Sequence, residues 1–235
     1  MHQFGLIILI GALAVAPATQ PSVDPALWAR MIEIDARAGR INSLVGDFEQ
    51  RKFTPLLRKP LLSTGRVRVK GATMRWDTEK PEKSVLFVTD KEVKIYYPAQ
   101  ASVEIYAIDQ RLAELASSPL PRLAALKDRF SFMQIPVADM DKSADAAKFM
   151  ALKLIPAQDE LRQHVQDVKV LLEMAAGYIV QVELTDADGD RTVDRFVNVQ
   201  LNGEVGDLEL KTPPGTKISR PLEGLGNQPP PVRSK

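Results

Sequence analysis

The chain contains no cysteine and only two histidines, His2 and His164, among its 235 residues. The absence of cysteine excludes disulfides, cysteine nucleophiles and thiolate metal sites. Two histidines are too few for a metal centre built from imidazole ligands. We therefore expect neither a metal site nor a bound cofactor, and we expect partners to be recognised by shape and apolar surface.

An excess of charge of either sign is also missing. The 31 Lys and Arg residues balance 30 Asp and Glu residues, which leaves a net charge of +1. Such a chain has no global field that would attract nucleic acid. The basic positions Arg66, Arg68 and Lys70 lack the interleaved aromatic residues of a nucleic-acid platform. They are interpreted as a solvated strand face, so nucleic acid is not an expected partner.

Catalytic motifs are absent as well. The chain has no Gly-x-Ser-x-Gly elbow, no Gly-rich phosphate loop and no His-Glu-x-x-His helix. The acidic run 186–190 suggests a calcium loop, but its glycine is fourth and its twelfth position is Val197, so a hairpin turn is the better interpretation. His164 lies in a polar segment and is expected at the surface. These observations favour a binding protein over an enzyme.

The chain has few long apolar runs. The run Leu6 to Ala16 is too short to span a membrane and has the length of a signal-peptide core. The small residues around Ala18 offer a cleavage site, so residues 1–18 are interpreted as an export signal. Its first residues carry no Lys or Arg, and a non-cleaved anchor or a misassigned start remains the alternative. The mature protein is expected to be soluble and outside the cytoplasm.

The most regular stretch runs from Val67 to Ile105. Large apolar residues occur at every second position and are separated by Gly, Pro and Asp turn signals, which predicts an antiparallel meander with one buried face. The apolar residues 85–88 are adjacent to one another, so this strand is expected to be covered on both faces. The meander therefore needs a cover from elsewhere in the chain.

Two helical regions could supply that cover. Asp24 and Pro25 predict the start of an amphipathic helix that ends near Gly39. Residues 109–129 also show helical spacing, broken by two prolines. This second region is interpreted as a jointed lid, and the alternative is a fixed connection whose leucines complete the core. The predicted lid residues are Leu112, Leu115, Leu120, Leu123 and Leu126.

Further strands are predicted by alternation and turn residues. They cover residues 44–53, 130–135, 149–155, 168–174, 178–184, 192–201 and 208–210. About ten or eleven strands in all indicate a large barrel or a strongly curved sheet, mainly β with short helices. Residues 19–220 are expected to form one domain, followed by a Pro- and Gly-rich disordered tail, 221–235.

The order of several short motifs resembles the periplasmic outer-membrane lipoprotein carrier family of the LolA type. The resemblance covers roughly residues 25–220. The motifs are Phe48-Glu49-Gln50, the Gly65–Lys70 strand, Met74-Arg75-Trp76, Tyr96-Tyr97-Pro98, Phe196-x-Asn198 and the Leu208–Thr216 ending. Each motif is weak alone, and their order and spacing carry the match.

The resemblance implies an incomplete antiparallel β-barrel whose concave apolar face is covered by short helices. It also implies a monomeric periplasmic carrier of lipoprotein acyl chains that performs no enzymatic step. Acylated lipoproteins or other lipids are the expected cargo, with an inner-membrane releasing transporter and an outer-membrane acceptor as candidate partners. The predicted cavity residues are Phe48, Met74, Trp76, Phe87 and Ile95.

One departure from the family pattern concerns the lid. The family's Arg-Pro, whose arginine holds the lid shut, matches Lys70-Gly71 here. Lysine lacks the planar fork of arginine, so the predicted gate is Lys70, with Arg68 or Arg75 as a substitute. Two other functions remain open: an envelope lipid binder or sensor whose cargo is not a lipoprotein, and an interaction module whose core is filled by its own side chains.

Overall fold

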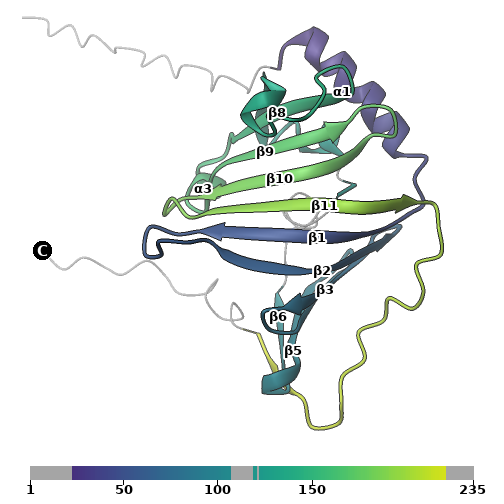
Figure 1. Cartoon of the computed structure of the whole chain (residues 1–235), viewed down its shortest axis with the longest axis vertical. Helices are drawn as coiled ribbons and strands as arrows, with labels where there is room; N and C mark the ends of the chain where they lie inside the picture. The colour runs from purple at the N-terminus through teal and green to yellow at the C-terminus, as the bar shows by residue number, and fades with distance from the viewer. Residues whose placement is uncertain (1–22, 107–118, 121, 221–235) are drawn as a thin grey trace, which may run out of the picture.

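The computed structural model describes residues 23–106, 119–120 and 122–220. The predicted export signal, the first lid segment with Leu112 and Leu115, and the predicted tail lie outside the described residues. Within the described residues, no helix is both long and apolar enough to span a bilayer. Figure 1 shows a strongly curved sheet with one long helix across one end.

The sheet contains twelve strands within the described residues and does not close into a barrel. Its strand order is β12-β6-β5-β4-β3-β2-β1-β11-β10-β9-β8-β7. All neighbours pair antiparallel except β12 and β6. The strands are β1 (Ser43–Phe53), β2 (Leu61–Lys70), β3 (Thr73–Lys80), β4 (Ser84–Val88), β5 (Val93–Tyr97), β6 (Ser102–Tyr106), β7 (Phe130–Ile135), β8 (Phe149–Pro156), β9 (Val165–Glu173), β10 (Tyr178–Asp186), β11 (Arg191–Leu201) and β12 (Lys217–Ser219).

The helix α1 (Pro25–Ala38) begins where the sequence predicts it. The Asp24 side chain accepts a hydrogen bond from the Leu27 backbone N–H at 2.9 Å, and Pro25 occupies the first turn. The buried face of α1 joins the same apolar core as the concave face of the sheet. The short helical elements are η1 (Pro98–Gln100), η2 (Leu123–Leu126), η3 (Val137–Asp139) and α3 (Asp159–Arg162).

The strand β1 lies in the middle of the sheet, between the β2–β6 meander and the β11–β7 half. Phe48 lies opposite Gly65 on β2 and opposite Phe196 on β11. A Cβ atom at Gly65 would lie 2.0 Å from the Asp77 carbonyl oxygen and 2.9 Å from the Phe48 ring. Glycine at this position therefore lets the phenylalanine ring lie flat over the neighbouring strand.

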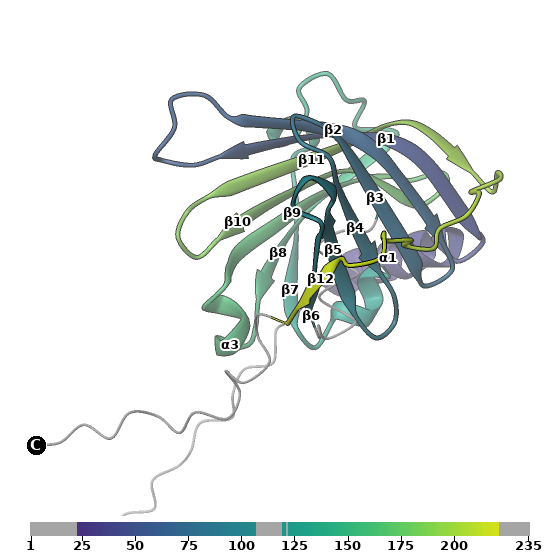
Figure 2. The same cartoon turned by 90° about the horizontal axis from the view of Figure 1, so that it is seen from below.

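The end of the described chain differs from the sequence prediction. Residues 208–210 form no strand, and the chain from about residue 202 to 216 runs as an extended segment across the outer, convex side of the meander (Figure 2). We call residues 202–216 the strap. After the strap, β12 pairs in parallel with β6. The sequence therefore predicted a final strand at 208–210, within the strap, whereas the observed final strand is β12.

The strand β4 is covered on both faces, as its adjacent apolar residues predict. Leu86 and Val88 belong to the core on the concave side. On the convex side, Val85 and Leu210 of the strap both pack against a separate cluster formed by Tyr96, Val103 and Ile105. The cover on the convex side is therefore the strap, whereas the sequence interpretation expected the cover to come from helical regions.

Candidate functional site

The concave face of the sheet is built around three aromatic rings. Phe48 and Trp76 have ring centroids 4.5 Å apart, and Trp76 meets Phe196 edge-on at 5.4 Å. All three side chains are buried. Rings at these separations attract one another beyond their apolar burial. The trio therefore fills the centre of the curved sheet with rigid side chains.

The structure places four of the five predicted cavity residues on the concave face. Phe48, Met74 and Trp76 are buried there, and Ile95 is half-buried against the same core. These positions share a face because direct partners in an antiparallel ladder point the same way. Trp76 lies opposite Leu86, which in turn lies opposite Ile95.

The prediction that Phe87 faces the cavity is wrong. Phe87 lies opposite Arg75 on β3 and Lys94 on β5, so its side chain is on the convex side. Leu86 occupies the concave position instead. In a run of four adjacent apolar residues, alternation does not tell which alternate pair points inward, and a register difference of one residue reverses the face.

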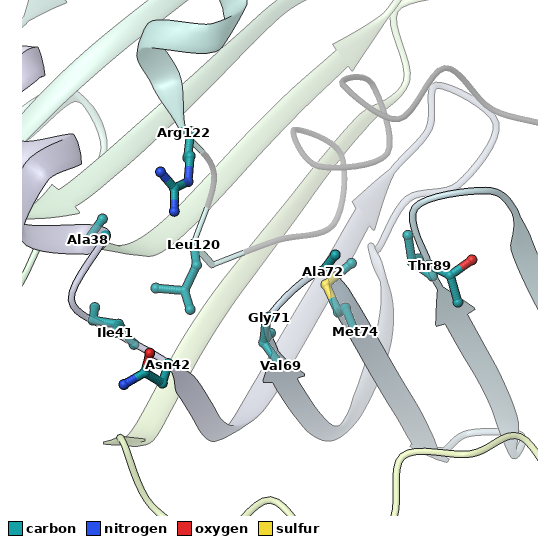
Figure 3. Close-up of a pocket in the computed structure, with 12 residues that line it drawn as sticks. Ala38, Ile41, Asn42, Val69, Gly71, Ala72, Met74, Thr89, Leu120 and Arg122 are labelled. Atoms are coloured by element: carbon teal, nitrogen blue, oxygen red, sulfur yellow. The ribbon is translucent and has the colours of Figure 1, made fainter.

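A cavity of about 410 Å³ opens at the edge of this core, beside the end of α1. It lies between the β2–β3 turn, the end of β4 and the chain at Leu120 and Arg122 (Figure 3). Figure 3 shows Leu120 and Arg122 directed into the space bounded by Ile41 and Met74. The lining residues are Ala38, Gly39, Ile41, Asn42, Val69, Gly71, Ala72, Met74, Val88, Thr89, Leu120 and Arg122.

The described part of the predicted lid packs on α1. Leu123 and Leu126 are each only 1% exposed, and Leu120 is half-buried at the cavity. The Asp35 carboxylate accepts the Leu123 backbone N–H at 3.2 Å and the Ala124 backbone N–H at 2.7 Å. Burial raises the pKa of Asp35, although these two N–H donors favour its ionised form. One carboxylate of α1 thus holds the start of η2 against the helix.

The predicted gate residues lie at different places. Lys70 is exposed at the end of β2, next to the cavity-lining Gly71. Arg75 lies on the convex side, where it donates to Asp77 at 2.9 Å and to the Glu209 carbonyl at 2.7 Å. Arg68 binds the same Asp77 carboxylate at 2.7 Å. The prediction that Arg75 or Arg68 holds the lid is wrong for residues 119–120 and 122–126, because both arginines bind the strap on the opposite face.

The cation at the cavity is Arg122, which the sequence interpretation did not single out. Its only signal in the sequence is its place directly after the two prolines that break the second helical region. Within the described residues it lines the cavity without a carboxylate among the other lining residues. Arg122 also contributes a favourable charge interaction to Asp35. The cavity lining is therefore mixed: Val69, Met74 and Leu120 supply apolar surface, and polar groups, among them the cationic Arg122, supply the rest.

A second ionisable group, Asp194, is buried on the concave face. It lies opposite Gln50 on β1, whose side-chain amide donates to it at 2.9 Å. Burial raises the pKa of Asp194 to about 6, and the Gln50 hydrogen bond only partly offsets this. Its signal in the sequence is its spacing of two residues from Phe196, which places both side chains on the same face of the strand. Within the described residues, no group of three or more His, Asp or Glu could hold a metal ion.

The geometry defines a class of protein: an open β half-barrel whose apolar concave face is covered by a helix and a short helical turn. The model of the family "Outer membrane lipoprotein carrier protein LolA" matches residues 39–209, which is most of the chain. The chain therefore belongs to the LolA family. Members of this superfamily bind lipids or lipoproteins.

Solved structures resemble this chain at low sequence identity. MucB is 15% identical with a TM-score of 0.50, over 84% of this chain and 66% of MucB. An uncharacterised conserved protein of Thermus thermophilus is 11% identical with a TM-score of 0.49, over 83% and 99%. The Mycobacterium tuberculosis lipoprotein LppX is 9% identical with a TM-score of 0.44, over 77% and 99%. No match was found among curated proteins.

Proposed function

We propose that this protein is a soluble periplasmic carrier that binds the acyl chains of lipoproteins and passes them toward the outer membrane without catalysing a reaction. The observation that supports this proposal is the cavity with a partly apolar lining at the edge of the concave core, between the β2–β3 turn, the end of α1 and the chain at Leu120 and Arg122, in a chain of the LolA family. An inner-membrane transporter that loads the carrier and an outer-membrane acceptor are the partners that such a role requires.

Apolar contact alone is strong enough for this task. Each buried methylene group contributes about 0.8 kcal/mol, so the affinity grows with the length of acyl chain that the protein buries. Side chains such as Val69, Met74 and Leu120 supply the apolar wall. A cavity of about 410 Å³ is at the small end of the range for ligand sites, about 300–1,000 Å³. Cargo with three acyl chains therefore requires η2 and the cover to move away from the sheet.

A second candidate function is the binding of a free acidic lipid in the envelope. The observation in its favour is Arg122, whose cationic side chain points into the cavity (Figure 3). A guanidinium group binds a carboxylate or phosphate through paired hydrogen bonds. The lipid anchor of a lipoprotein offers no such group, so Arg122 favours a fatty acid or a phospholipid.

Mass spectrometry of material that co-purifies with the protein from the native envelope distinguishes these functions. Triacylated lipoprotein supports the carrier, and a free fatty acid or phospholipid supports the second candidate. Protein purified under mild conditions with neither cargo would contradict both. An interaction module filled by its own side chains, such as the Phe48–Trp76–Phe196 trio, would then be the better interpretation.

Blocking the cavity tests its role directly. Ala72 lines the cavity and is exposed at the β2–β3 turn, so Ala72→Trp fills the opening with little cost to the core. We expect this variant to lower the affinity for a fluorescent fatty acid at least tenfold, about 1.4 kcal/mol. Ala99→Trp, on the exposed η1 turn, is the matched control and keeps the wild-type affinity. Equal affinity of folded Ala72→Trp and wild-type protein would show that the ligand binds elsewhere.

A further inference from the structure

Exposed leucines gather at one place on the surface, the turn between β1 and β2. We call residues 51–62 the hairpin tip. Leu56 is 91% exposed, Leu57 46%, Leu61 54% and Leu62 59%. Single exposed leucines are ordinary on protein surfaces, but a cluster of four within seven positions indicates a surface that binds a partner.

The hairpin tip is held out from the body on a stiff stem. Strand pairing continues up to Lys52 and Leu61. The Arg191 guanidinium lies over the Phe53 ring at 4.1 Å, and Lys52 pairs with Asp190 at 3.1 Å. In Figure 2 the β1–β2 hairpin lies beside the β10–β11 turn and extends beyond it. The leucines therefore remain exposed, because the hairpin tip extends past the end of the strand pairing.

The charge of the hairpin tip has one sign. Residues 51–62 include Arg51, Lys52, Arg58 and Lys59, and they include no Asp or Glu. Arg51 and Lys52 lie near carboxylates, at 3.9 Å from Glu49 and 3.1 Å from Asp190 respectively. Within the described part of the chain, Arg58 and Lys59 form no ion pair, so the outermost cations of the tip are available to a partner.

Leucines interleaved with free cations fit a lipid surface better than a protein surface. Protein interfaces concentrate their binding energy in Trp, Tyr and Arg, whereas leucine is under-represented among such anchors. Residues 51–62 contain no Trp or Tyr; of the typical anchors they contain only Arg51, which lies near Glu49, and Arg58. At a membrane, leucines enter the boundary between headgroups and acyl chains, and flexible cations remain at the phosphates. A local cluster of cations can bind anionic lipids even though the net charge of the whole chain is only +1.

We propose that the hairpin tip is a docking site for an anionic membrane surface. Leu56, Leu57, Leu61 and Leu62 insert into the headgroup–acyl boundary, and Arg58 and Lys59 bind lipid phosphates. The proposal does not depend on which cargo the cavity holds. It does orient the molecule: β1 has 11 residues, so at about 3.3 Å per residue its two ends are roughly 35 Å apart. Since Asn42 beside the start of β1 lines the cavity, docking at the tip points the cavity away from the bilayer.

Vesicle co-sedimentation of the full chain tests this site. The probes are vesicles of phosphatidylglycerol with phosphatidylethanolamine, and vesicles of phosphatidylcholine alone. We expect wild-type protein to bind the anionic vesicles and not the neutral ones. Each cation near an anionic surface contributes roughly fivefold in affinity, so R58Q/K59Q should bind about 25-fold more weakly at low salt.

The leucines require their own variant and control. L56S/L57S should lose at least tenfold in affinity for anionic vesicles at any salt concentration, because it removes the inserted apolar surface. I218S is the matched control, since Ile218 is 68% exposed on β12, away from the tip. It should bind like wild type. All variants should retain fluorescent fatty-acid binding, which separates this test from that of the cavity.

Insertion has a spectroscopic signature. Leu56→Trp should show a blue-shifted emission with anionic vesicles and should be quenched by brominated acyl chains. Wild-type protein that stays in the supernatant with both kinds of vesicle would overturn the proposal. L56S/L57S protein that sediments as wild type does would overturn it as well, and either result would leave a protein partner as the occupant of the tip.

Discussion

Asp194 is an ionisable residue in a buried, largely apolar environment. It is a carboxyl group buried on the concave face, with Gln50 as its hydrogen-bond donor. Desolvation raises its pKa to about 6, so at neutral pH the folded protein carries a buried negative charge. A raised pKa of an acid means that its contribution to stability is fully present below the unfolded pKa and is lost as the pH rises through the folded pKa.

We predict that Asp194→Asn stabilises the protein at pH 7 by roughly 2 to 3 kcal/mol, from about 1.4 kcal/mol per pKa unit. The asparagine carbonyl still accepts from Gln50 and carries no charge. The difference between variant and wild type should shrink as the pH falls from about 6 toward 4, where Asp194 becomes protonated. Urea unfolding at pH 7 and pH 4.5 measures it. A difference that does not change with pH would mean that the pKa of Asp194 is the same in the folded and the unfolded protein, so that burial does not perturb it.

Single residues also show where sequence reasoning stops. Met74 and Trp76 alternate with polar residues, and their concave placement could be predicted from that alternation. Phe87 and Leu86 are both apolar and adjacent, so only the strand register decides which of them faces inward. Arg122 becomes a functional candidate through neighbours far away in the chain, which no local pattern reveals.

Among the elements, η2 is held in place by an unusual cap. Asp35 on α1 accepts the backbone N–H groups of Leu123 and Ala124, which begin η2. Free N–H groups at the start of a helical turn need an acceptor, and here the acceptor belongs to another element. The contact between α1 and η2 thus depends on one side chain beside the cavity.

We predict that Asp35→Ala loosens η2, because two buried N–H groups lose their acceptor. The cost should be about 1 to 2 kcal/mol, as for the loss of a helix cap. Hydrogen exchange at residues 123–126 should become faster, while exchange in α1 changes little. Glu33→Ala is a suitable control, since Glu33 is exposed on the same helix and its nearest cation, Arg37, is 3.8 Å away. Equal protection of residues 123–126 in Asp35→Ala and wild type would show that packing alone fixes η2.

The helix α1 and most strands were predictable, because caps, prolines and alternation act locally. The predicted helix over 121–129 was too long. Only Leu123–Leu126 form a helical turn, closed by bonds such as that from the Ala125 N–H to the Arg122 carbonyl. The leucines of this turn are buried in the core that α1 shares, so packing rather than helix length fixes its position.

At the scale of the whole molecule, the strap joins the end of the described chain to the meander. Arg68 and Arg75 share the carboxylate of Asp77 and donate to the strap carbonyls of Asp207 and Glu209. Burial of Asp77 would raise its pKa, but the hydrogen bonds from Arg75 and Arg68 outweigh burial and lower it. The arginine–strap hydrogen bonds join residues that are 139 and 134 positions apart in the sequence. For this reason the strap could not be predicted from the sequence.

We predict that Arg75→Ala releases the strap. The variant loses charge-assisted hydrogen bonds to Asp77 and Glu209, at a cost on the order of 2 kcal/mol. Tryptic cleavage after Lys211 should become about tenfold faster, since 1.4 kcal/mol corresponds to a factor of ten. Arg66→Ala is the control, because Arg66 is exposed and only 3.8 Å from Asp47. Unchanged cleavage in Arg75→Ala would show that Leu210 and the β12–β6 pairing hold the strap without the arginines.

The position of the strap in the chain has a consequence for the timing of folding. The meander emerges from the ribosome well before the strap, whose Leu210 packs on the cluster of Tyr96, Val103 and Ile105. Contacts with such large separations along the chain close slowly. The outer apolar patch of the meander therefore stays uncovered until the strap has been synthesised.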